Sequence, residues 1–342
     1  MLEAIANRFK ETAPAVDYWT LRLVRDTTNV LSVRQNIVEP PTTSRDAGAM
    51  VTVLDGGGLG YGATSDLTPQ GLAAAFDAAR EWATATAGAN LISPEDYPRL
   101  VRKGEYHYEG EIPWDAWSVG QKMELLQTAS QSLKIHDDIS DWYAFLIHTR
   151  TDTLLVSSNG GWIEQSVARM QPVLGVVANR GAETQNRGFG RETFFQGGLE
   201  HLARTGFPDM GEKVAQEALY LLDAPTCPTG ITDLVLMPSQ MVLQVHESIG
   251  HPLEMDRILG DERNYAGTSF VTPEMFGNYQ YGSALLNVTF DPDVPGETAS
   301  YRFDDDGTEA EKVFLIQDGI LVRPLGGAIS QARSGLPGVA NS

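Results

Sequence analysis

Apolar and polar residues alternate along three stretches of the chain, which is the period of half-buried β-strands. Residues 18–39, YWTLRLVRDTTNVLSVRQNIVE, alternate and are rich in β-branched side chains, and residues 48–65 read as strand, glycine turn and strand. The alternation returns from residue 142 to about 195, with Asn159 and Gly160 in the position of a hairpin turn. The pattern therefore predicts antiparallel sheet in the first two thirds of the chain.

Helical periodicity marks three further segments, two between these strands and one after them. Thr68 is positioned to cap a helix that begins at Pro69 and continues through the alanine-rich GLAAAFDAAREWATATA. A second helix is predicted at about 119–135, and a third at 211–224, where the next residue is a proline that cannot continue it. Residues 91–118 contain prolines and no clean period, so we expect them to form a connecting arm.

Three small residues, Gly58, Gly60 and Ala63, fit the G-x-G-x-x-A spacing of a dinucleotide-binding loop. In that motif a helix begins directly after the glycines. Here the glycines stand inside an alternating run, and the next helix begins only near Thr68. The sequence therefore favours a hairpin over a phosphate-binding loop.

Length and charge restrict the class of protein. At 342 residues the chain is too long for one ordinary core, so we expect two domains or one large α+β body. Its net charge of -20 opposes binding to polyanions, because affinity for nucleic acid depends on lysine and arginine displacing counterions from phosphates. Direct binding to nucleic acid is therefore not expected.

The sequence also indicates the compartment. Residues 1–19 lack the apolar core of a secretion signal, and no later run approaches the roughly 20 apolar residues of a membrane span. The single cysteine, Cys227, excludes an internal disulfide framework and fits a reducing environment. We therefore expect a cytoplasmic protein without contact to a membrane.

The candidate chemistry lies in residues 242–256, VLQVHESIGHPLEMD, which hold two of the six histidines five residues apart. Glu247 follows the first of these histidines directly. The preceding ITDLVLMPSQ predicts a short buried strand at 233–237 and then a helix that Ser239 caps and that runs through His246.

The spacing of the two histidines differs from a familiar zinc motif. In H-E-x-x-H, histidines at i and i+4 share a helix face and bind zinc, and the glutamate serves as general base. His246 and His251 are five apart, which in a regular α-helix separates them by about 140°, too far to share one ion. Gly250 permits unusual backbone angles, and Pro252 lacks an N–H and crowds the carbonyl of Ser248. We therefore expect a widened π-like turn or an early end of the helix, either of which can turn the second histidine towards the metal.

The residues alone leave simpler interpretations open. His246 and His251 could be hydrogen-bonded core residues, with Glu247 a solvated charge. Glu254 and Asp256 follow the second histidine and are candidates either for extra metal ligands or for acceptors of an imidazole N–H, although such side chains more often face water.

A second acidic stretch, FDDDGTE at 303–309, suggests calcium but lacks the twelve-residue loop with its terminal glutamate. A turn between two strands, with Asp306 and Gly307 at its tip, is the favoured interpretation.

The segment VHESIGHPLEMDRILGDERNYAGTSF resembles the signature of the TldD/PmbA family of metalloproteases, in particular the TldD-like subunit that carries H-E-x-x-x-H. Three other stretches resemble the family in the same order: VLSVRQNIVE with DAGAMVTVLDGGGLGYGATSDLT, then EALYLLDAPTCPTG, then YRFDDDGTEAEKVFLIQDGILV. The similarity covers nearly the whole chain. After the second histidine the family usually has a small residue where this chain has Pro252, which affects the expected shape of the helix more than the chemistry.

The resemblance implies a zinc-dependent peptidase that cleaves unstructured peptides, with His246 and His251 as metal ligands and Glu247 as general base. It also implies a dimer, either of identical chains or with a PmbA-like subunit that lacks the motif. The implied fold is α+β: mostly antiparallel sheet with covering helices in an N-terminal domain, residues 1–224, and a β-rich, metal-bearing C-terminal domain, residues 225–342, that is incomplete.

The resemblance further implies a third protein ligand, a cysteine in a C-terminal segment of the family that lies beyond residue 342. Cys227 is expected to be out of reach, because the strand and helix that follow it span too great a length. We therefore expect the chain to bind Zn²⁺ weakly and to hydrolyse peptides poorly, unless Glu254 or Asp256 completes the site. The competing function is a non-catalytic peptide-binding or regulatory subunit of such a complex.

Overall fold

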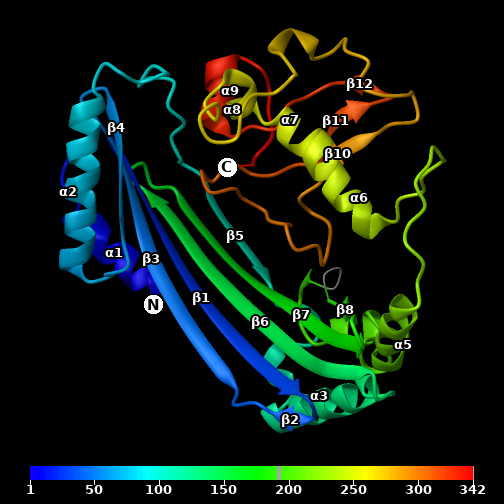
Figure 1. Ribbon diagram of the computed structural model, residues 1–342. Coiled ribbons are helices and arrows are strands. Elements are labelled where there is room, and N and C mark those ends of the chain that lie inside the picture. The colour runs from blue at the N-terminus through cyan, green and yellow to red at the C-terminus, as the bar shows by residue number, and fades with distance from the viewer. Residues whose placement is uncertain (191–193, 342) are drawn as a thin grey trace.

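A long, curved sheet forms the body of the protein (Figure 1). The computed structural model describes residues 1–190 and 194–341. The main strand order is β4-β3-β1-β6-β7-β5, with β2 beside β1 and with β8 and β9 beside β7. All pairs are antiparallel except β5 with β7. The strands are β1 (Tyr18–Arg34), β2 (Ile37–Val38), β3 (Thr42–Asp55), β4 (Gly58–Thr64), β5 (Lys103–Tyr108), β6 (Ile139–Ser157), β7 (Trp162–Arg180), β8 (Glu183–Phe189) and β9 (Phe195–Gln196).

The hairpins predicted from the alternation are confirmed. β1 and β2 pair through a turn at Gln35 and Asn36, both of which have positive φ. β6 and β7 pair through the predicted turn at Asn159-Gly160, where Gly160 has a φ of 85°. The prediction of a plain connecting arm at 91–118 is wrong in part, because the arm contributes β5 to the sheet edge as well as a single 3₁₀ turn, η1 (Trp114–Ala116).

Helices cover one face of the sheet in two groups. On β1, the odd-numbered residues Leu21 and Leu23 pack in one apolar core and Leu31 and Val33 in the other, so both cores lie on the same face. No helix in the described part of the chain is long and apolar enough to cross a membrane. The helices of the first group are α1 (Leu2–Thr12) and α2 (Pro69–Thr86), and those of the second are α3 (Val119–Leu133), α4 (Glu200–Arg204), η2 (Phe207–Asp209) and α5 (Gly211–Leu222).

Glycines of β4 allow α2 to pack directly on the sheet. A Cβ at Gly60 would lie 2.0 Å from the carbonyl oxygen of Ala79, and one at Gly58 would lie 1.6 Å from that of Ala83. The predicted cap is confirmed, since the hydroxyl of Thr68 accepts a hydrogen bond from the N–H of Gly71. The predicted hairpin is confirmed by the pairing of β3 with β4, and the structure adds that its glycines serve the packing of α2.

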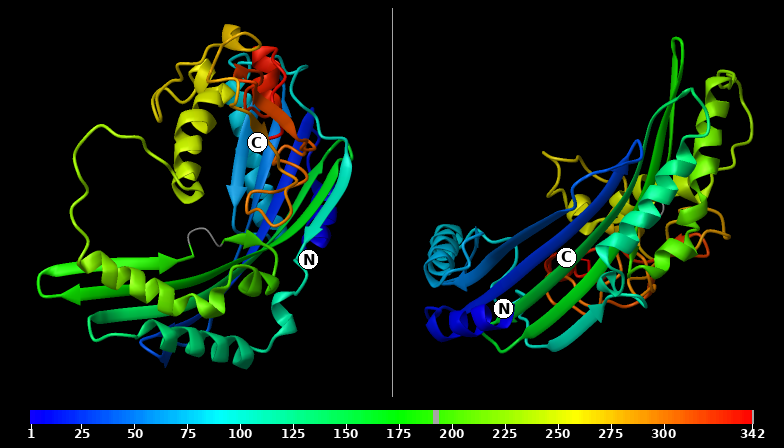
Figure 2. Two further views of the ribbon diagram at one scale, coloured as in Figure 1. Left: turned by 90° about the vertical axis from the view of Figure 1, so that its right-hand side faces the viewer. Right: turned by 90° about the horizontal axis from the view of Figure 1, so that it is seen from below.

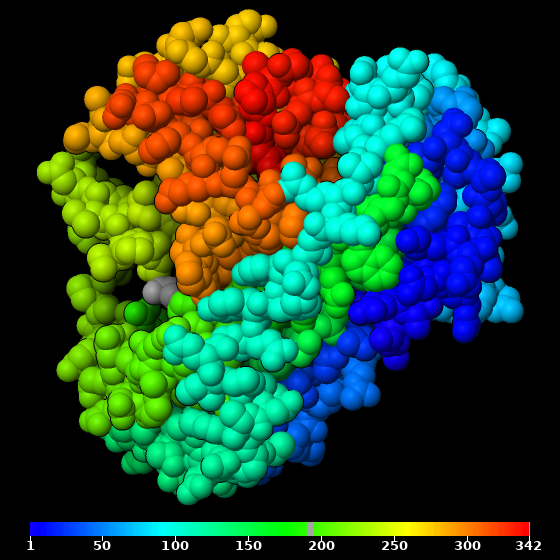
Figure 3. Space-filling model, turned by 180° about the vertical axis from the view of Figure 1, so that it is seen from behind, coloured from blue at the N-terminus to red at the C-terminus, as the bar shows by residue number. Residues whose placement is uncertain are grey.

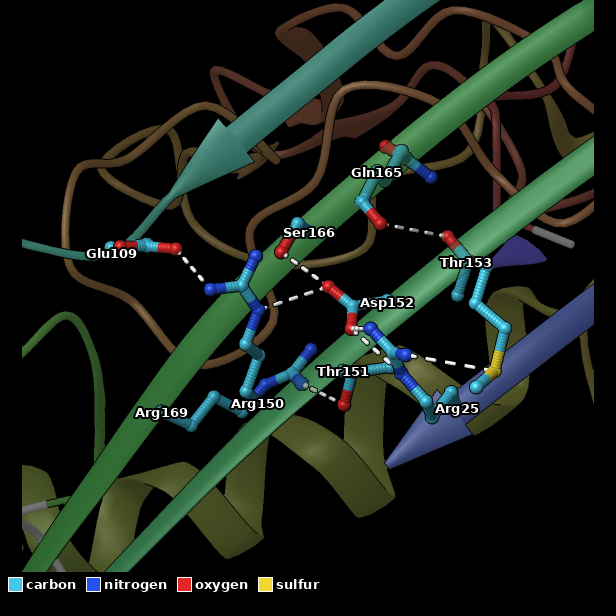
Figure 4. A network of polar contacts seen from close by, with 10 residues as sticks. Arg25, Glu109, Arg150, Thr151, Asp152, Thr153, Gln165, Ser166 and Arg169 are labelled. Atoms are coloured by element: carbon cyan, nitrogen blue, oxygen red, sulfur yellow. Dashed lines mark hydrogen bonds and ion pairs between the residues drawn. The ribbon is translucent and has the colours of Figure 1, made fainter. Parts of the chain in front are cut away.

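A polar network separates the two cores (Figure 4). Asp152 of β6 accepts hydrogen bonds from Arg25 of β1 at 2.6 Å, from Arg150 at 3.0 Å and from Ser166 of β7 at 2.7 Å. Arg150 also pairs with Glu109 of the arm. Burial raises the pKa of Asp152, but the hydrogen bonds from Arg25, Ser166 and Arg150 outweigh burial and hold that pKa below its ordinary value. The network therefore contains a charged carboxylate and attaches the arm to the sheet.

The C-terminal part of the chain packs on the opposite face of the sheet through residues around Phe303, whereas α6 has no buried residue. Figure 3 shows this part, coloured orange to red, beside the arm, coloured cyan. Asp305 pairs with Arg22 of β1 at 2.8 Å, and the carbonyl of Phe303 accepts a hydrogen bond from Gln165 of β7 at 2.9 Å. A division into domains at 224/225 stays a prediction. The elements of this part are α6 (Pro238–Val245), η3 (His246–Gly250), α7 (His251–Leu253), α8 (Met255–Leu259), η4 (Pro273–Met275), β10 (Val288–Phe290), β11 (Val313–Gln317), β12 (Ile320–Leu321) and α9 (Ala328–Ser334).

The connection from α5 to α6 is extended and exposed (Figure 2). The prediction of a buried strand at 233–237 is wrong: these residues lie in no strand of the structure, and Val235 is 86% exposed. The prediction of Ser239 as the helix cap is also wrong. Pro238 occupies the first helical position, where no N–H is needed, so Met237 takes the cap position.

Candidate metal centre

The helix that carries the histidines widens at the motif. α6 ends at Val245 and continues as a π-helical turn, η3, of residues 246–250. Its defining bond joins the two histidines, because the N–H of His251 donates to the carbonyl of His246, five residues earlier. The π-like turn predicted from Gly250 and Pro252 is therefore confirmed.

The wide turn brings the two imidazoles together. The ring centroids of His246 and His251 lie 4.3 Å apart, with their planes inclined by 73°. One donor atom each from His246, Glu247 and His251 lies within 4.8 Å of the others. The side chain of His246 is 57% exposed and that of Glu247 59% exposed, so the interpretation of His246 as a core histidine is wrong.

These side chains suit a divalent transition metal. Two imidazoles and a carboxylate are donors that zinc accepts, and its ligand distances of about 2.0–2.2 Å place the donors of one tetrahedral ion about 3.4 Å apart. The donor atoms here lie within 4.8 Å of one another, so rotation of the exposed side chains would have to bring them closer around an ion. The exposed side of the cluster leaves room for a water molecule and a substrate, as an open metal site needs.

Glu254 orients the second histidine. Its two carboxylate oxygens lie 3.0 and 3.1 Å from Nδ1 of His251, so they accept the hydrogen bond of an Nδ1–H and leave Nε2 free to bind a metal. Glu254 is in turn 3.5 Å from Nε of Arg257, which also pairs with Glu262 at 2.9 Å. The sequence left two roles open for Glu254, a metal ligand or an acceptor of an imidazole N–H. The contact with Nδ1 of His251 is that of the acceptor.

The other two candidate ligands lie outside the cluster. The carboxylate of Asp256 accepts a hydrogen bond from the hydroxyl of Ser330 on α9. Cys227 is exposed in the connection before α6, where its thiol contacts the carbonyl of Pro228 at 3.8 Å. Within residues 1–190 and 194–341, neither residue belongs to the group of ligand atoms around His246.

Sequence analysis missed one residue at this centre. The hydroxyl of Tyr281 donates a hydrogen bond to the carbonyl of Ser248, in the middle of the π-turn. The amide of Gln244 donates to the hydroxyl of the same serine. The absent N–H of Pro252 signals that the Ser248 carbonyl needs another donor, but the sequence does not say which residue supplies it.

A cavity of about 520 Å³ lies beside the centre, between the sheet and the C-terminal residues. Its walls include Tyr18, Arg22 and Tyr97 on the sheet side and Glu254 and Asp256 on the other. Because Glu254 also contacts His251, the cavity and the histidine cluster share a wall.

The acidic stretch 303–309 forms the predicted turn, but an isolated bridge between Phe303 and Glu309 flanks it in place of the two predicted strands. Oδ1 of Asp304 accepts hydrogen bonds from the N–H of Asp306 at 3.1 Å and of Thr308 at 2.8 Å, and Gly307 has a φ of 81°. The carboxylate of Asp304 therefore holds the turn together.

Two family models match the sequence. PmbA/TldA metallopeptidase domain 1 matches residues 19–83, and the PmbA/TldA metallopeptidase C-terminal domain matches residues 229–342. Together they cover more than half of the chain.

Curated relatives carry metalloprotease names. A metalloprotease of Methanothermobacter thermautotrophicus is 23% identical over 96% of this chain and 68% of its own length. The Synechocystis metalloprotease slr0863 is 26% identical over 94% of this chain and 66% of its own length. A TldD homologue of Haemophilus influenzae is 24% identical over 90% of this chain and 62% of its own length. The chain thus spans about two thirds of the length of these relatives.

Solved structures share the fold. A candidate modulator of DNA gyrase from Bacteroides thetaiotaomicron superposes with a TM-score of 0.75 at 13% identity, over 99% of this chain and 75% of the other. TldE from Thermococcus kodakarensis superposes with a TM-score of 0.62 at 16% identity, over 100% of this chain and 73% of the other. At these identities the likeness concerns the fold.

Proposed function

This chain belongs to the PmbA/TldD metallopeptidase family, and on that premise we propose that it is the metal-bearing subunit of a zinc-dependent peptidase that acts on unstructured peptides. Its curated relatives are named metalloproteases. One observation carries the proposal: donor atoms of His246, Glu247 and His251 lie within 4.8 Å of one another on one turn of helix.

In this proposal His246 and His251 hold the metal, and Glu247 is the general base. A zinc ion held by these two imidazoles would supply a water of lowered pKa and would polarise the scissile carbonyl. The carboxylate of Glu247, whose Oε1 lies 3.8 Å from Nε2 of His246, would accept the proton of that water. Glu254 keeps the proton of His251 on Nδ1, so that Nε2 stays available. Peptide hydrolysis then needs no covalent intermediate.

The exposure of the cluster supports an extended substrate. The side chains of His246 and Glu247 are more than half exposed, so a peptide backbone can approach them without displacing a folded segment. The adjoining cavity of about 520 Å³ offers space for a part of the substrate beyond the scissile bond. We propose that unfolded peptides are the substrate because an extended segment can reach the exposed cluster and the adjoining cavity at the same time.

We further propose that the chain works as a dimer in the cytoplasm, either with an identical chain or with a PmbA-like subunit. The TldE protein with which the chain superposes has the same fold, as the two subunits of such a pair would have.

Cleavage of a fluorescently labelled unfolded peptide with added zinc tests the proposal. Because Glu254 and Asp256 make other contacts and do not join the cluster, we expect the wild-type chain to cleave the peptide slowly. Glu247→Gln should cleave it at least a hundredfold more slowly still, because a general base contributes about 10²–10⁴-fold. Glu212→Gln on α5, also an exposed glutamate, is the matched control and should cleave as the wild type does.

Two outcomes contradict the proposal. Equal cleavage by the wild type and Glu247→Gln excludes Glu247 as the base. Binding of the peptide without cleavage by either protein, in the presence of zinc, supports a non-catalytic peptide-binding subunit instead.

A further inference from the structure

Pro252 leaves one carbonyl of the π-turn without its usual donor. In a regular helix the carbonyl of Ser248 accepts the N–H of the residue four places on, which is Pro252. Proline has no N–H to donate. A helix carbonyl that loses its donor destabilises the folded state unless another group supplies the hydrogen bond. Without that hydrogen bond the backbone of the turn is less restrained.

Tyr281 supplies that hydrogen bond from outside the motif. Its hydroxyl donates to the carbonyl of Ser248, across 33 residues of sequence. A carbonyl oxygen has no hydrogen to give, so the tyrosine must be the donor. Burial raises the pKa of Tyr281 above its ordinary value, and the neighbouring Tyr279 raises it further. The hydroxyl therefore keeps its proton at neutral pH.

The tyrosine is itself anchored independently of the helix. Its backbone N–H donates to the carbonyl of Gly319 at 2.8 Å, in the turn between β11 and β12. Its ring packs against Phe270, with centroids 5.8 Å apart, and meets Tyr279 edge-on at 6.1 Å. The hydroxyl therefore reaches the π-turn from a position fixed by the turn between β11 and β12.

We propose that Tyr281 is a positioning residue for the metal centre: its bond to Ser248 holds the π-turn in the shape that brings His246 and His251 together. The i→i−5 bond between the histidines spans Ser248, so a movement of the serine carbonyl changes the spacing of the two rings. The consequence for metal binding rests on the proposed function, whereas the effect on the shape of the turn does not.

Zinc titration of the metal-free protein tests the consequence for the metal. Tyr281→Phe removes only the hydroxyl, and we expect it to weaken zinc binding about tenfold. The lost hydrogen bond stabilises the metal-binding shape of the π-turn by a free energy that corresponds to about this change in affinity. Tyr279→Phe makes the same change on the neighbouring ring and should leave zinc affinity unchanged. Equal melting temperatures of the two variants exclude general unfolding as the cause.

Amide hydrogen exchange in the absence of metal tests the shape of the turn directly. The N–H of His251 makes the i→i−5 bond, so it should exchange several-fold faster in Tyr281→Phe and at the wild-type rate in Tyr279→Phe. Unchanged exchange of His251 in Tyr281→Phe, or unchanged zinc affinity in a protein whose wild type binds zinc, overturns the inference. If the wild type binds no zinc and cleaves no peptide, the proposed function fails, and the exchange rates still decide the role of Tyr281.

Discussion

The imidazole rings of His246 and His251 meet with their centroids 4.3 Å apart, although five residues separate them along a helix. A regular α-helix would turn the second histidine about 140° away from the first. The N–H of His251 bonds instead to the carbonyl of His246, which closes a wider turn. The backbone conformation of the π-turn therefore brings the two rings together. Residues that stabilise this conformation are as important to the metal centre as the histidines are.

Glu254 should strengthen metal binding without being needed for the fold. Glu254→Ala removes the acceptor of the His251 Nδ1–H, so we expect zinc affinity to fall about 10- to 100-fold. Glu254→Gln keeps an acceptor oxygen and should lose less. Isothermal titration of the metal-free variants with zinc measures both. Wild-type affinity in Glu254→Ala would mean that the His251 ring is oriented by its packing alone.

The β4 glycines should be essential to the packing of α2. A Cβ at Gly60 would lie 2.0 Å from the carbonyl of Ala79, so we expect Gly60→Ala to lower the free energy of unfolding by about 2 kcal/mol or more. Gly120, in the first turn of α3, offers a control, because its nearest neighbour to an added Cβ is 3.8 Å away. Gly120→Ala should be neutral or stabilising by up to about 1 kcal/mol. Urea denaturation of the two variants decides, and similar stabilities would contradict the described packing.

A buried histidine should make the fold sensitive to acid. His148 of β6 is 7% exposed and stacks on Trp114 at a centroid distance of 4.9 Å. Burial lowers its pKa to about 4; Asp115 acts in the opposite direction, and Lys122 and Arg150 lower it further. The unfolded chain binds this proton at about pH 6.5, so the stabilisation is complete above that pH and is lost as the pH falls towards 4.

The loss between pH 7 and pH 5 should be about 2 kcal/mol from this histidine alone. His148→Phe keeps a ring against Trp114 and cannot titrate, so its stability should fall less over the same interval. Chemical denaturation at the two pH values measures the difference. Equal losses in wild type and variant would show that other groups account for the acid sensitivity.

The connection between α5 and α6 should be the first site of proteolysis. Residues 225–236 lie outside the helices and strands and make no backbone hydrogen bonds to other described residues, and Val235 is 86% exposed. Limited thermolysin digestion should therefore cut near Leu234 and Val235. Because Asp305 pairs with Arg22 and Phe303 packs against Leu100, the two fragments should stay associated in gel filtration. A first cut within the sheet would contradict this description.

Local signals made much of the fold predictable. The cap at Thr68, the turn at Asn159-Gly160 and the alternation of β1 each depend on residues a few positions apart, and each was read correctly. The wide turn at the histidines was also predictable, because Gly250 and Pro252 act on their own helix.

Features that depend on distant neighbours were not predictable in this way. The apolar run at 233–237 has the composition of a buried strand, but a strand also needs a neighbouring strand, which the pattern of one segment does not reveal. β5 was missed because its place at the sheet edge is set by pairing with β7, about 60 residues later. The bond from Tyr281 to Ser248 was missed for the same reason.

Equilibrium titration of the metal-free chain with zinc, compared with His251→Ala, tests the central claim most directly. The account predicts weak binding of one zinc ion per wild-type chain and an affinity at least tenfold lower still in His251→Ala, because removing one imidazole from the cluster leaves a single histidine beside Glu247. Absence of zinc binding by the wild type, or equal binding by the variant, would contradict the assignment of this turn as the metal centre.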